Sequence, residues 1–372
     1  MGPLPTVARE AGQMALARKS QPWSVTVPDF FDPVDRYRRL VAQVLGADVE
    51  GVAVTPSVSY GLATAAANLT VAPEHRIVVL ADQFPSNVYI WRDLAQRCGA
   101  RVVTVEVPSD KTPTEALVEA IDDGVDVVAS APAHWTDGRV VDLRAVGAAA
   151  RAHDAALVVD VCQAAGAVPL DVSEWGAAFV AGATYKWLLG PYSLGFVWVG
   201  ADHRDGRPLE HNWIARAGSD DFAHLVDYTD EFGAGARRFD MGEVSNFVSI
   251  ATALASLELV VEQWGVERIS AWARRLTDSI ADGAADLGLG VVPEGQRSPH
   301  LQGLTLAADV DPEAVAVGLA ERQVNVSVRG RSVRVSAHVW NDASDVDRLL
   351  AALAELVDGS PTVSSSSGGH VR

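Results

Sequence analysis

Short apolar runs alternate with segments of helical periodicity between about residues 34 and 199. Apolar runs bounded by polar residues are typical of buried parallel strands, whereas apolar positions spaced three and four apart indicate helices that cover a sheet. This alternation predicts an α/β fold with a mainly parallel, doubly wound sheet and helices on both of its faces. The expected strands are residues 77–80, 102–107, 125–130, 156–160, 177–181 and 195–199, and the expected helices are residues 60–69, 87–98 and 143–153.

The pattern changes after Asn246, where two long amphipathic helices, residues 247–264 and 266–287, lead into a smaller α+β domain. Its expected strands are residues 301–306, 324–328 and 333–337, and its expected helices are residues 312–322 and 345–357. The chain therefore divides into an N-terminal segment (1–30), a large domain (31–245), linking helices with a small C-terminal domain (246–358) and a tail (359–372). The tail is rich in serine and glycine, which predicts disorder.

Composition narrows the class of protein. The 372 residues are 48% apolar, so the chain can bury a large core. A formal net charge of −18 at pH 7 repels phosphate backbones and anionic lipid, and no basic stripe interleaved with aromatic residues offsets it. We expect neither nucleic acid nor a membrane as partner.

Cysteine usage and the ends of the chain favour a cytoplasmic protein. Cys98 and Cys162 are the only cysteines, which argues against a disulfide framework and fits a reducing compartment. No Cys-x-x-Cys or His-Glu-x-x-His spacing offers a metal site. The N-terminus lacks the basic and apolar regions of a signal peptide, and no apolar run approaches the length that spans a membrane.

A carboxylate and a lysine follow two of the predicted strands. Asp160 ends the strand 156–160, and Lys186 follows the strand 177–181 within the run GATYKWLLGP. Open α/β sheets bind ligands at the carboxyl ends of their strands, so both side chains should converge there. Pyridoxal phosphate needs such a pair, because an amine holds its aldehyde while an anion keeps its ring nitrogen protonated. A solvated lysine and an aspartate that caps the next helix are the simpler alternatives.

Four motifs, in this order and spacing, carry a resemblance to a known family. They are residues 160–166 (DVCQAAG), 185–191 (YKWLLGP), 238–242 (RFDMG) and 334–341 (RVSAHVWN). Over nearly its whole length the chain resembles the class V aminotransferase and cysteine desulfurase superfamily of fold-type I pyridoxal phosphate enzymes, which includes kynureninase, selenocysteine lyase and isopenicillin N epimerase. The resemblance implies a large domain with a mainly parallel sheet, a smaller C-terminal α+β domain and a homodimer.

The resemblance also implies roles for residues around the cofactor ring. Lys186 is expected to form the Schiff base with the cofactor and to move protons at the substrate's α-carbon. Asp160 is expected to pair, ionised, with the pyridinium nitrogen. The Gln163 amide matches a donor to the phenolic oxygen, and Phe84 matches the ring that stacks on the pyridine. Cys162, between them, reads as a small buried residue.

For the phosphate, the resemblance points to a helix N-terminus and to the neighbouring subunit. Val58 and Ser59 precede or begin the helix near Tyr60, where backbone amides favour an anion. Ser59 matches the family's phosphate hydroxyl, with an ordinary helix cap as the alternative. Tyr185 matches a phosphate-contacting residue. Gly242 and Glu243 match a stretch that reaches into the partner subunit's site, although a glutamate is an unusual neighbour for a phosphate.

For the substrate, Arg334 resembles the arginine that grips the α-carboxylate in a bidentate pair, with Arg329 and Arg331 as competitors. Trp135 and His134 follow the strand 125–130 and are expected to face the substrate. The family implies an enzyme on an amino acid. The lyase-like members share the pattern of residues 84–87 (FPSN), which favours β-elimination with C–S or C–Se cleavage over transamination or epimerisation. A non-catalytic, dimeric binding or regulatory protein is the alternative of another class.

One departure from the family limits this interpretation. A cysteine desulfurase carries a nucleophilic thiol on the loop before the carboxylate-binding arginine, and residues 324–334 contain no cysteine. The sequence therefore argues against desulfuration through an enzyme persulfide.

Overall fold

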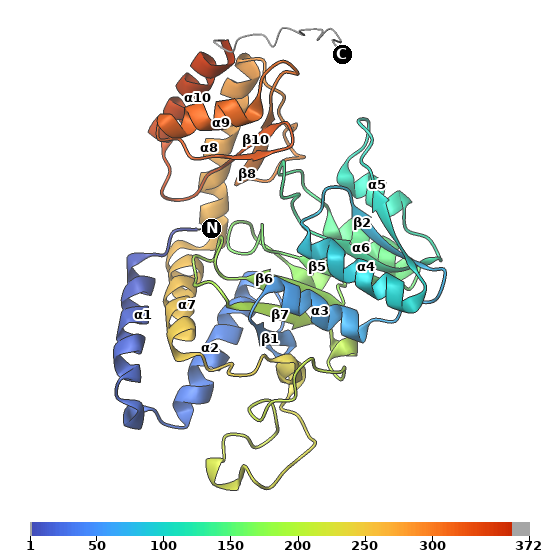
Figure 1. The fold of residues 1–372 in the computed structure, drawn as a ribbon, viewed down its shortest axis with the longest axis vertical. Coiled ribbons are helices and arrows are strands. Elements are labelled where there is room, and N and C mark those ends of the chain that lie inside the picture. The colour runs from blue at the N-terminus through green and yellow to red at the C-terminus, as the bar shows by residue number, and fades with distance from the viewer. Residues whose placement is uncertain (1, 359–372) are drawn as a thin grey trace, which may run out of the picture. The chain divides into compact units, whose positions relative to one another are not determined.

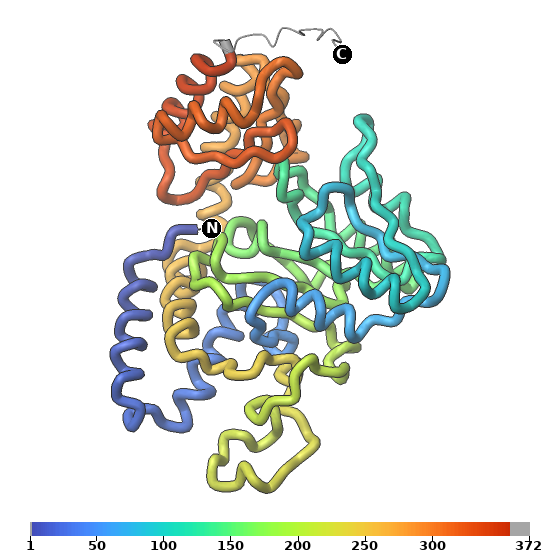
Figure 2. Tube along the Cα trace, viewed as in Figure 1, coloured from blue at the N-terminus to red at the C-terminus, as the bar shows by residue number. Residues whose placement is uncertain are grey.

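Residues 2–358 are described by a computed structural model, and they form two compact units (Figures 1 and 2). The first unit comprises residues 2–134 and 140–268, and the second comprises Trp135–Arg139 together with the described residues from Ile269 onward. The expected domain boundary at residue 245 precedes α7 (Phe247–Leu257), whereas in the structure α7 packs against helices near the N-terminus and belongs to the first unit. The tail expected to be disordered, residues 359–372, lies outside the described residues.

A seven-stranded sheet forms the centre of the first unit, in the order β1-β7-β6-β5-β4-β2-β3. The five strands from β3 to β6 in this order are parallel, and β7 pairs antiparallel with both β6 and β1. The mainly parallel α/β fold is thus confirmed. The strands are β1 (Val52–Thr55), β2 (Arg76–Leu80), β3 (Arg101–Val105), β4 (Val125–Ser130), β5 (Ala156–Asp160), β6 (Phe179–Ala183) and β7 (Gly195–Val199).

The central strands β4 and β5 are buried along nearly their whole length, because helices cover both faces of this sheet. On one face, α3 (Val58–Asn68) and α4 (Ser86–Cys98) pack Leu62 and Trp91 against Val79 and Val158. On the other face, Gly147 of α6 (Leu143–Ala152) lies against Leu157. A capping box is present at α5 (Pro113–Glu119), where Thr112 and Glu115 exchange hydrogen bonds.

Three further helices pack together in the first unit (Figure 1): α1 (Thr6–Lys19), α2 (Pro28–Leu45) and α7. A π-helical segment, Glu258–Trp264, continues α7. Contrary to the sequence-based expectation, residues Phe247–Trp264 are long and apolar enough to cross a membrane. Glu258 and Glu262 on this segment nevertheless pair with Arg36 of α2, and its apolar residues pack against α1 and α2. A third of this stretch is buried in the structure.

The second unit has its own core. An antiparallel sheet in the order β8-β10-β9 packs against three helices through Leu304, Leu319, Val333 and Leu353. Its elements are α8 (Val266–Asp286), β8 (Leu301–Thr305), α9 (Pro312–Glu321), β9 (Ser327–Arg329), β10 (Ser332–Ser336) and α10 (Ala343–Asp358).

The sequence pattern identified most strands to within two or three residues, but it missed β1. This strand has four residues, too few to show a period, and the strand with which it pairs, β7, lies far along the chain.

Candidate active site

Asp160 and Lys186 leave neighbouring strands at the same edge of the sheet. Asp160 ends β5 and pairs with Ala181 of β6, and Lys186 lies three residues beyond the end of β6. The Asp160 carboxylate is 7% exposed, and its Oδ1 accepts the Cys162 amide at 2.8 Å. Burial raises the pKa of Asp160, while the Cys162 amide and the positive charge of Lys186 oppose this rise. Asp160 is therefore a buried carboxylate that lacks an ion pair within the described residues, and a cationic ring nitrogen would stabilise its charge.

A tight loop presents Lys186. The Gly190 amide donates to the Thr184 carbonyl at 2.8 Å, and the Thr184 hydroxyl is bonded to the carbonyls of Pro191 and Leu194 at 2.8 and 2.9 Å. A Cβ on Gly190 would lie 2.6 Å from the Thr184 Cβ, so only glycine fits there. The buried Thr184 side chain thus fixes both ends of the loop.

The Lys186 ammonium lies over aromatic rings. Its Nζ is 5.4 Å from the centroid of Phe84 and 5.9 Å from that of Tyr185, within the range of cation–π attraction. Within the described residues this ammonium makes neither a hydrogen bond nor an ion pair. The structure therefore places Lys186, Phe84 and Tyr185 together, with an amine that is available for chemistry.

Gln163 lies in the turn after Asp160, and its side chain meets the lysine loop. Trp187 donates its indole Nε1–H to Gln163 Oε1 at 3.1 Å. In the same turn, Gly166 has a φ of +90°, and a Cβ there would lie 2.8 Å from the Trp187 carbonyl oxygen. The turn carrying Asp160 and Gln163 is thus packed directly on the loop carrying Lys186.

The segment expected to bind phosphate leads from β1 into α3. The N-cap of α3 is Ser57, whose hydroxyl accepts the Tyr60 amide at 3.1 Å, and not Ser59. Val58 and Ser59 occupy the first turn, and the exposed Ser59 hydroxyl has no hydrogen-bond partner within residues 2–358. This leaves a helix N-terminus and a hydroxyl for an anion.

Residues 240–243 are held within their own chain by β1 and by Glu210. The Met241 amide donates to the Val54 carbonyl at 2.9 Å, and the Gly242 amide donates to Glu210 Oε2 at 2.5 Å. Glu243 adopts a φ of +57°, which is uncommon for a residue with a side chain. Glu210 also acts with burial to raise the pKa of the Tyr60 hydroxyl. The contact that Gly242 and Glu243 are expected to make with a partner subunit stays a prediction.

Two of the expected substrate residues lie together in the second unit. The Arg334 guanidinium donates to the Trp135 carbonyl at 2.7 Å and lies 6.0 Å from the centroid of the indole ring, and Arg329 is 4.9 Å from the same ring. Burial, and then the charge of Arg329, lower the pKa of Arg334 to about 10. His134 belongs to the first unit, where its Nε2 lies 3.1 Å from the Ala81 carbonyl oxygen. Substrate contact by these residues stays a prediction.

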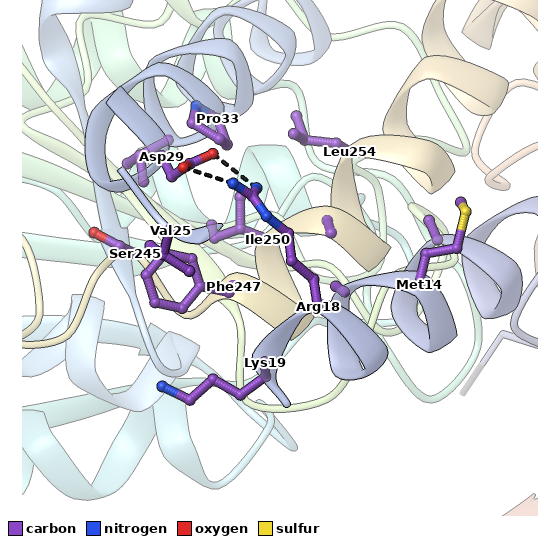
Figure 3. A pocket seen from close by; sticks show the side chains of 14 residues that line it. Met14, Arg18, Lys19, Val25, Asp29, Pro33, Ser245, Phe247, Ile250 and Leu254 are labelled. Carbon is purple, nitrogen blue, oxygen red and sulfur yellow. Dashed lines mark hydrogen bonds and ion pairs between the residues drawn. The ribbon is translucent and has the colours of Figure 1, made fainter. Parts of the chain in front are cut away.

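A separate cavity of about 340 Å³ lies among α1, α2 and α7 (Figure 3). Met14, Val34 and Leu254 contribute to its apolar lining, and the ion pair between Arg18 and Asp29 lies beside it. It contains none of the expected site residues. Within residues 2–358, no group of three or more His, Cys, Asp or Glu side chains could hold a metal ion.

The site residues fit pyridoxal phosphate on chemical grounds. Among residues 2–358, the structure supplies a buried carboxylate that makes no ion pair, an amine beside an aromatic ring, and a helix N-terminus with a hydroxyl that makes no hydrogen bond. Sequence analysis missed the supporting residues Thr184, Trp187 and Glu210, because hydrogen bonds to distant segments leave no local pattern. The position of Trp187 directly after the lysine was the only available signal.

Comparison with known proteins identifies the family of this chain. Residues 25–349 match the family model described as aminotransferase class-V. The chain is 26% identical over 365 residues to an uncharacterised aminotransferase of Bacillus subtilis, with 94% of each chain covered. It is 27% identical over 335 residues to isopenicillin N epimerase of Streptomyces clavuligerus, with 86% of this chain and 83% of the relative covered.

Two solved structures of C-DES share the fold. One carries a glycine covalently linked to its pyridoxal phosphate cofactor; its TM-score is 0.84 at 19% identity, with 95% of this chain and 94% of that chain covered. The other, described as a cystine C–S lyase with its product cysteine persulfide, has a TM-score of 0.83 at 21% identity, with 95% of each chain covered. The family match, the fold and the site residues lead to one conclusion: this chain belongs to the class-V aminotransferase family and is an enzyme that uses pyridoxal phosphate.

Proposed function

We propose that this enzyme acts on an amino acid through Lys186 and cleaves a C–S or C–Se bond at the β-carbon by elimination. One observation carries the assignment of Lys186. Its Nζ lies 5.4 Å from the Phe84 ring, and its charge acts on the pKa of the buried Asp160 carboxylate. An amine, an aromatic platform and an anion at one sheet edge form the set that a pyridoxal cofactor requires.

Each residue then has a defined task. Lys186 would hold the cofactor's aldehyde and would move the proton at the substrate's α-carbon. Asp160 holds the proton on the ring nitrogen, and Ser59 with the first-turn amides of α3 binds the phosphate. Arg334 binds the substrate's α-carboxylate. When bound, the cofactor supplies a conjugated ring that accepts electrons from the α-carbon.

The choice of elimination is supported by two observations. The chain is similar in fold to a cystine C–S lyase along 95% of its length. Residues 324–334 lack the cysteine on which a desulfurase would form an enzyme persulfide. The similarity to isopenicillin N epimerase and to an aminotransferase favours reprotonation without elimination as the alternative.

The lysine assignment has a direct test, because the chain contains three lysines: Lys19, Lys111 and Lys186. Reduction of the coloured enzyme with borohydride should fix the cofactor to one peptide, and mass spectrometry should find it on Lys186. In Lys186→Ala, borohydride should fix no cofactor to the protein, whereas Lys111→Ala should be labelled like the wild type because Lys111 pairs with Glu119 elsewhere. Label on another lysine, or undiminished labelling of Lys186→Ala, would contradict the assignment.

The reaction type has a separate test. Incubation with cystine and with cysteine or selenocysteine conjugates should release pyruvate and ammonia. Conversion of the cofactor to its amine form without pyruvate would indicate transamination, and exchange of the α-proton with inversion would indicate epimerisation. If the α-proton of every amino acid tested stayed unexchanged in heavy water, while ligands changed stability, a binding or regulatory role would replace catalysis.

We further propose a cytoplasmic homodimer, with Gly242 and Glu243 of each chain beside the partner's phosphate. The two cysteines are unpaired, which fits a reducing compartment. Light scattering should give twice the mass of the 39.3 kDa chain. Glu243→Gln should change the cofactor's dissociation constant if this side chain lies near the phosphate. A monomer that binds cofactor with full affinity would contradict the assembly.

A further inference from the structure

The orientation of the Gln163 amide is fixed by a tryptophan. The two ends of a glutamine amide are nearly equal in size, so its hydrogen-bond partners decide which end faces which neighbour. Trp187 offers an indole N–H, which can only donate, and its Nε1 lies 3.1 Å from Gln163 Oε1. The carbonyl end of the amide must therefore face Trp187, and the NH₂ end, which donates, is turned away from the indole.

The backbone around this hydrogen bond is closely packed. Gly166, in the turn after Gln163, has a φ of +90°, and a Cβ there would come within 2.8 Å of both the Trp187 carbonyl oxygen and Leu188 Cδ2. On the other side, Ser256 donates its hydroxyl to the Leu189 carbonyl at 2.8 Å. Neither Gln163 nor Trp187 can move away without disturbing these contacts, so their hydrogen bond joins two fixed segments.

We propose that Trp187 is a positioning residue: it holds the Gln163 amide so that its NH₂ group, and not its carbonyl oxygen, faces the phenolic oxygen of pyridoxal phosphate. This inference rests on the proposed function, together with the role that the family resemblance implies for Gln163 as a donor to that oxygen. A donor to the phenolic oxygen disperses its negative charge. The oxygen then attracts less strongly the proton on the neighbouring nitrogen contributed by Lys186.

The consequence is a measurable pH shift. Without the indole N–H, the amide loses the hydrogen bond that directs its carbonyl oxygen toward Trp187, so its NH₂ group is no longer held toward the phenolic oxygen by that bond. The Lys186 nitrogen should then keep its proton to higher pH, so the pH midpoint of the bound cofactor's colour change should rise. We expect a rise of about one pH unit in Trp187→Phe, on the order of the effect of one hydrogen bond to a charged group.

Trp198→Phe is the matched control. Trp198 is also largely buried and donates its Nε1–H to Asp48 Oδ1 at 3.1 Å, the same kind of hydrogen bond at a site on β7 away from Lys186. Its colour-change midpoint should equal that of the wild type. Gln163→Leu should shift the midpoint as Trp187→Phe does, and the double variant should add nothing, because both changes remove the same donor.

The outcomes separate this inference from the proposed function. A wild-type midpoint in Trp187→Phe together with a shifted Gln163→Leu would overturn the positioning role and leave the function intact. Additive shifts in the double variant would also overturn it. A wild-type midpoint in Gln163→Leu would show that Gln163 does not face the phenolic oxygen. A wild-type protein that binds no pyridoxal phosphate would instead overturn the proposed function. Each variant's cofactor dissociation constant, from absorbance titration, provides a readout that is independent of catalysis.

Discussion

Arg38 and Asp240 form a buried ion pair that holds residues 240–241 of the same chain against the outer edge of β1. Both side chains are 3% exposed, and Arg38 Nη2 lies 2.5 Å from Asp240 Oδ2. Asp240 Oδ1 also accepts the Val54 amide at 2.8 Å, and Arg38 Nη1 donates to the Val52 carbonyl at 2.8 Å. Since β1 leads directly into the expected phosphate segment, this pair positions that segment from outside the site.

Removing one partner of this pair should be costly, because the other charge stays buried. Arg38→Met should lower the free energy of unfolding by roughly 3–5 kcal/mol and weaken cofactor binding. Urea unfolding and absorbance titration measure the two effects. Arg36→Met, on the same helix, is the control: Arg36 pairs with Glu258 and Glu262 at the surface, where water screens the charges, so its loss should cost far less. Equal effects of the two substitutions would contradict a structural role for the Arg38 pair.

Asp160→Asn should stabilise the cofactor-free protein while it weakens the holoenzyme. Burial raises the pKa of Asp160, so this carboxyl favours folding most at low pH, and its contribution is lost as the pH rises through its folded-state pKa. At neutral pH the asparagine should therefore raise the free energy of unfolding of the apoenzyme by roughly 1–3 kcal/mol, the usual cost of a poorly compensated buried polar group. A less stable apoenzyme at pH 7 would show that the carboxylate is better satisfied than its contacts indicate.

Gly166→Ala should separate the steric effect of the contact with Trp187 from the strain of a positive φ. Gly218 is the control, because it has a φ of +73° and a Cβ there would meet no described residue within 4 Å apart from its chain neighbours. Both alanines lose roughly 1–2 kcal/mol to the left-handed conformation. Only Gly166→Ala also collides with the Trp187 carbonyl, so it should lose more stability and more cofactor affinity. Calorimetry on both variants gives the difference, and identical melting temperatures would argue against the close packing of the two segments.

Arg334→Lys should raise the KM of the amino acid substrate about tenfold or more with a smaller change in kcat, because an ammonium cannot reproduce a bidentate grip on a carboxylate. Arg331→Lys is the control, since Arg331 Nη2 donates to backbone carbonyls that include Val310 at 3.1 Å. Steady-state kinetics on both variants test the assignment. If Arg331→Lys had the larger effect on KM, Arg331 would be the carboxylate-binding residue.

His338 should make the protein sensitive to acid. It is 1% exposed and stacks on Trp340 with ring centroids 4.1 Å apart, and burial lowers its pKa from 6.5 to about 4. The stability that it contributes is present above about pH 6.5 and is lost as the pH falls toward 4, by up to roughly 3 kcal/mol. His338→Phe should remove this part of the pH dependence. Unfolding free energies of both proteins from pH 7 to pH 4 provide the comparison, and parallel curves would rule the effect out.

The sequence predicted the parts of the site that depend on local order along the chain. Apolar runs placed β5 and β6, and the residues that follow them, Asp160 and Lys186, do lie at one sheet edge because neighbouring parallel strands end there. The helix that follows the phosphate segment was also expected, although its cap is Ser57 and not Ser59. These features depend on the period of a strand or helix and on the residues at its ends, which are visible in a short stretch of chain.

Alternating apolar runs and four short motifs thus indicated the fold class and the family, and they predicted the residues that bear the chemistry. Only the tertiary structure decided how those residues are held. Trp187 donates a hydrogen bond to Gln163, and Arg38 forms an ion pair with Asp240, 202 residues further along the chain. Each of these contacts joins segments that the chain brings together only when its core packs. Local periodicity carries no information about such partners, because their energies come from burial and hydrogen-bond geometry in the folded protein.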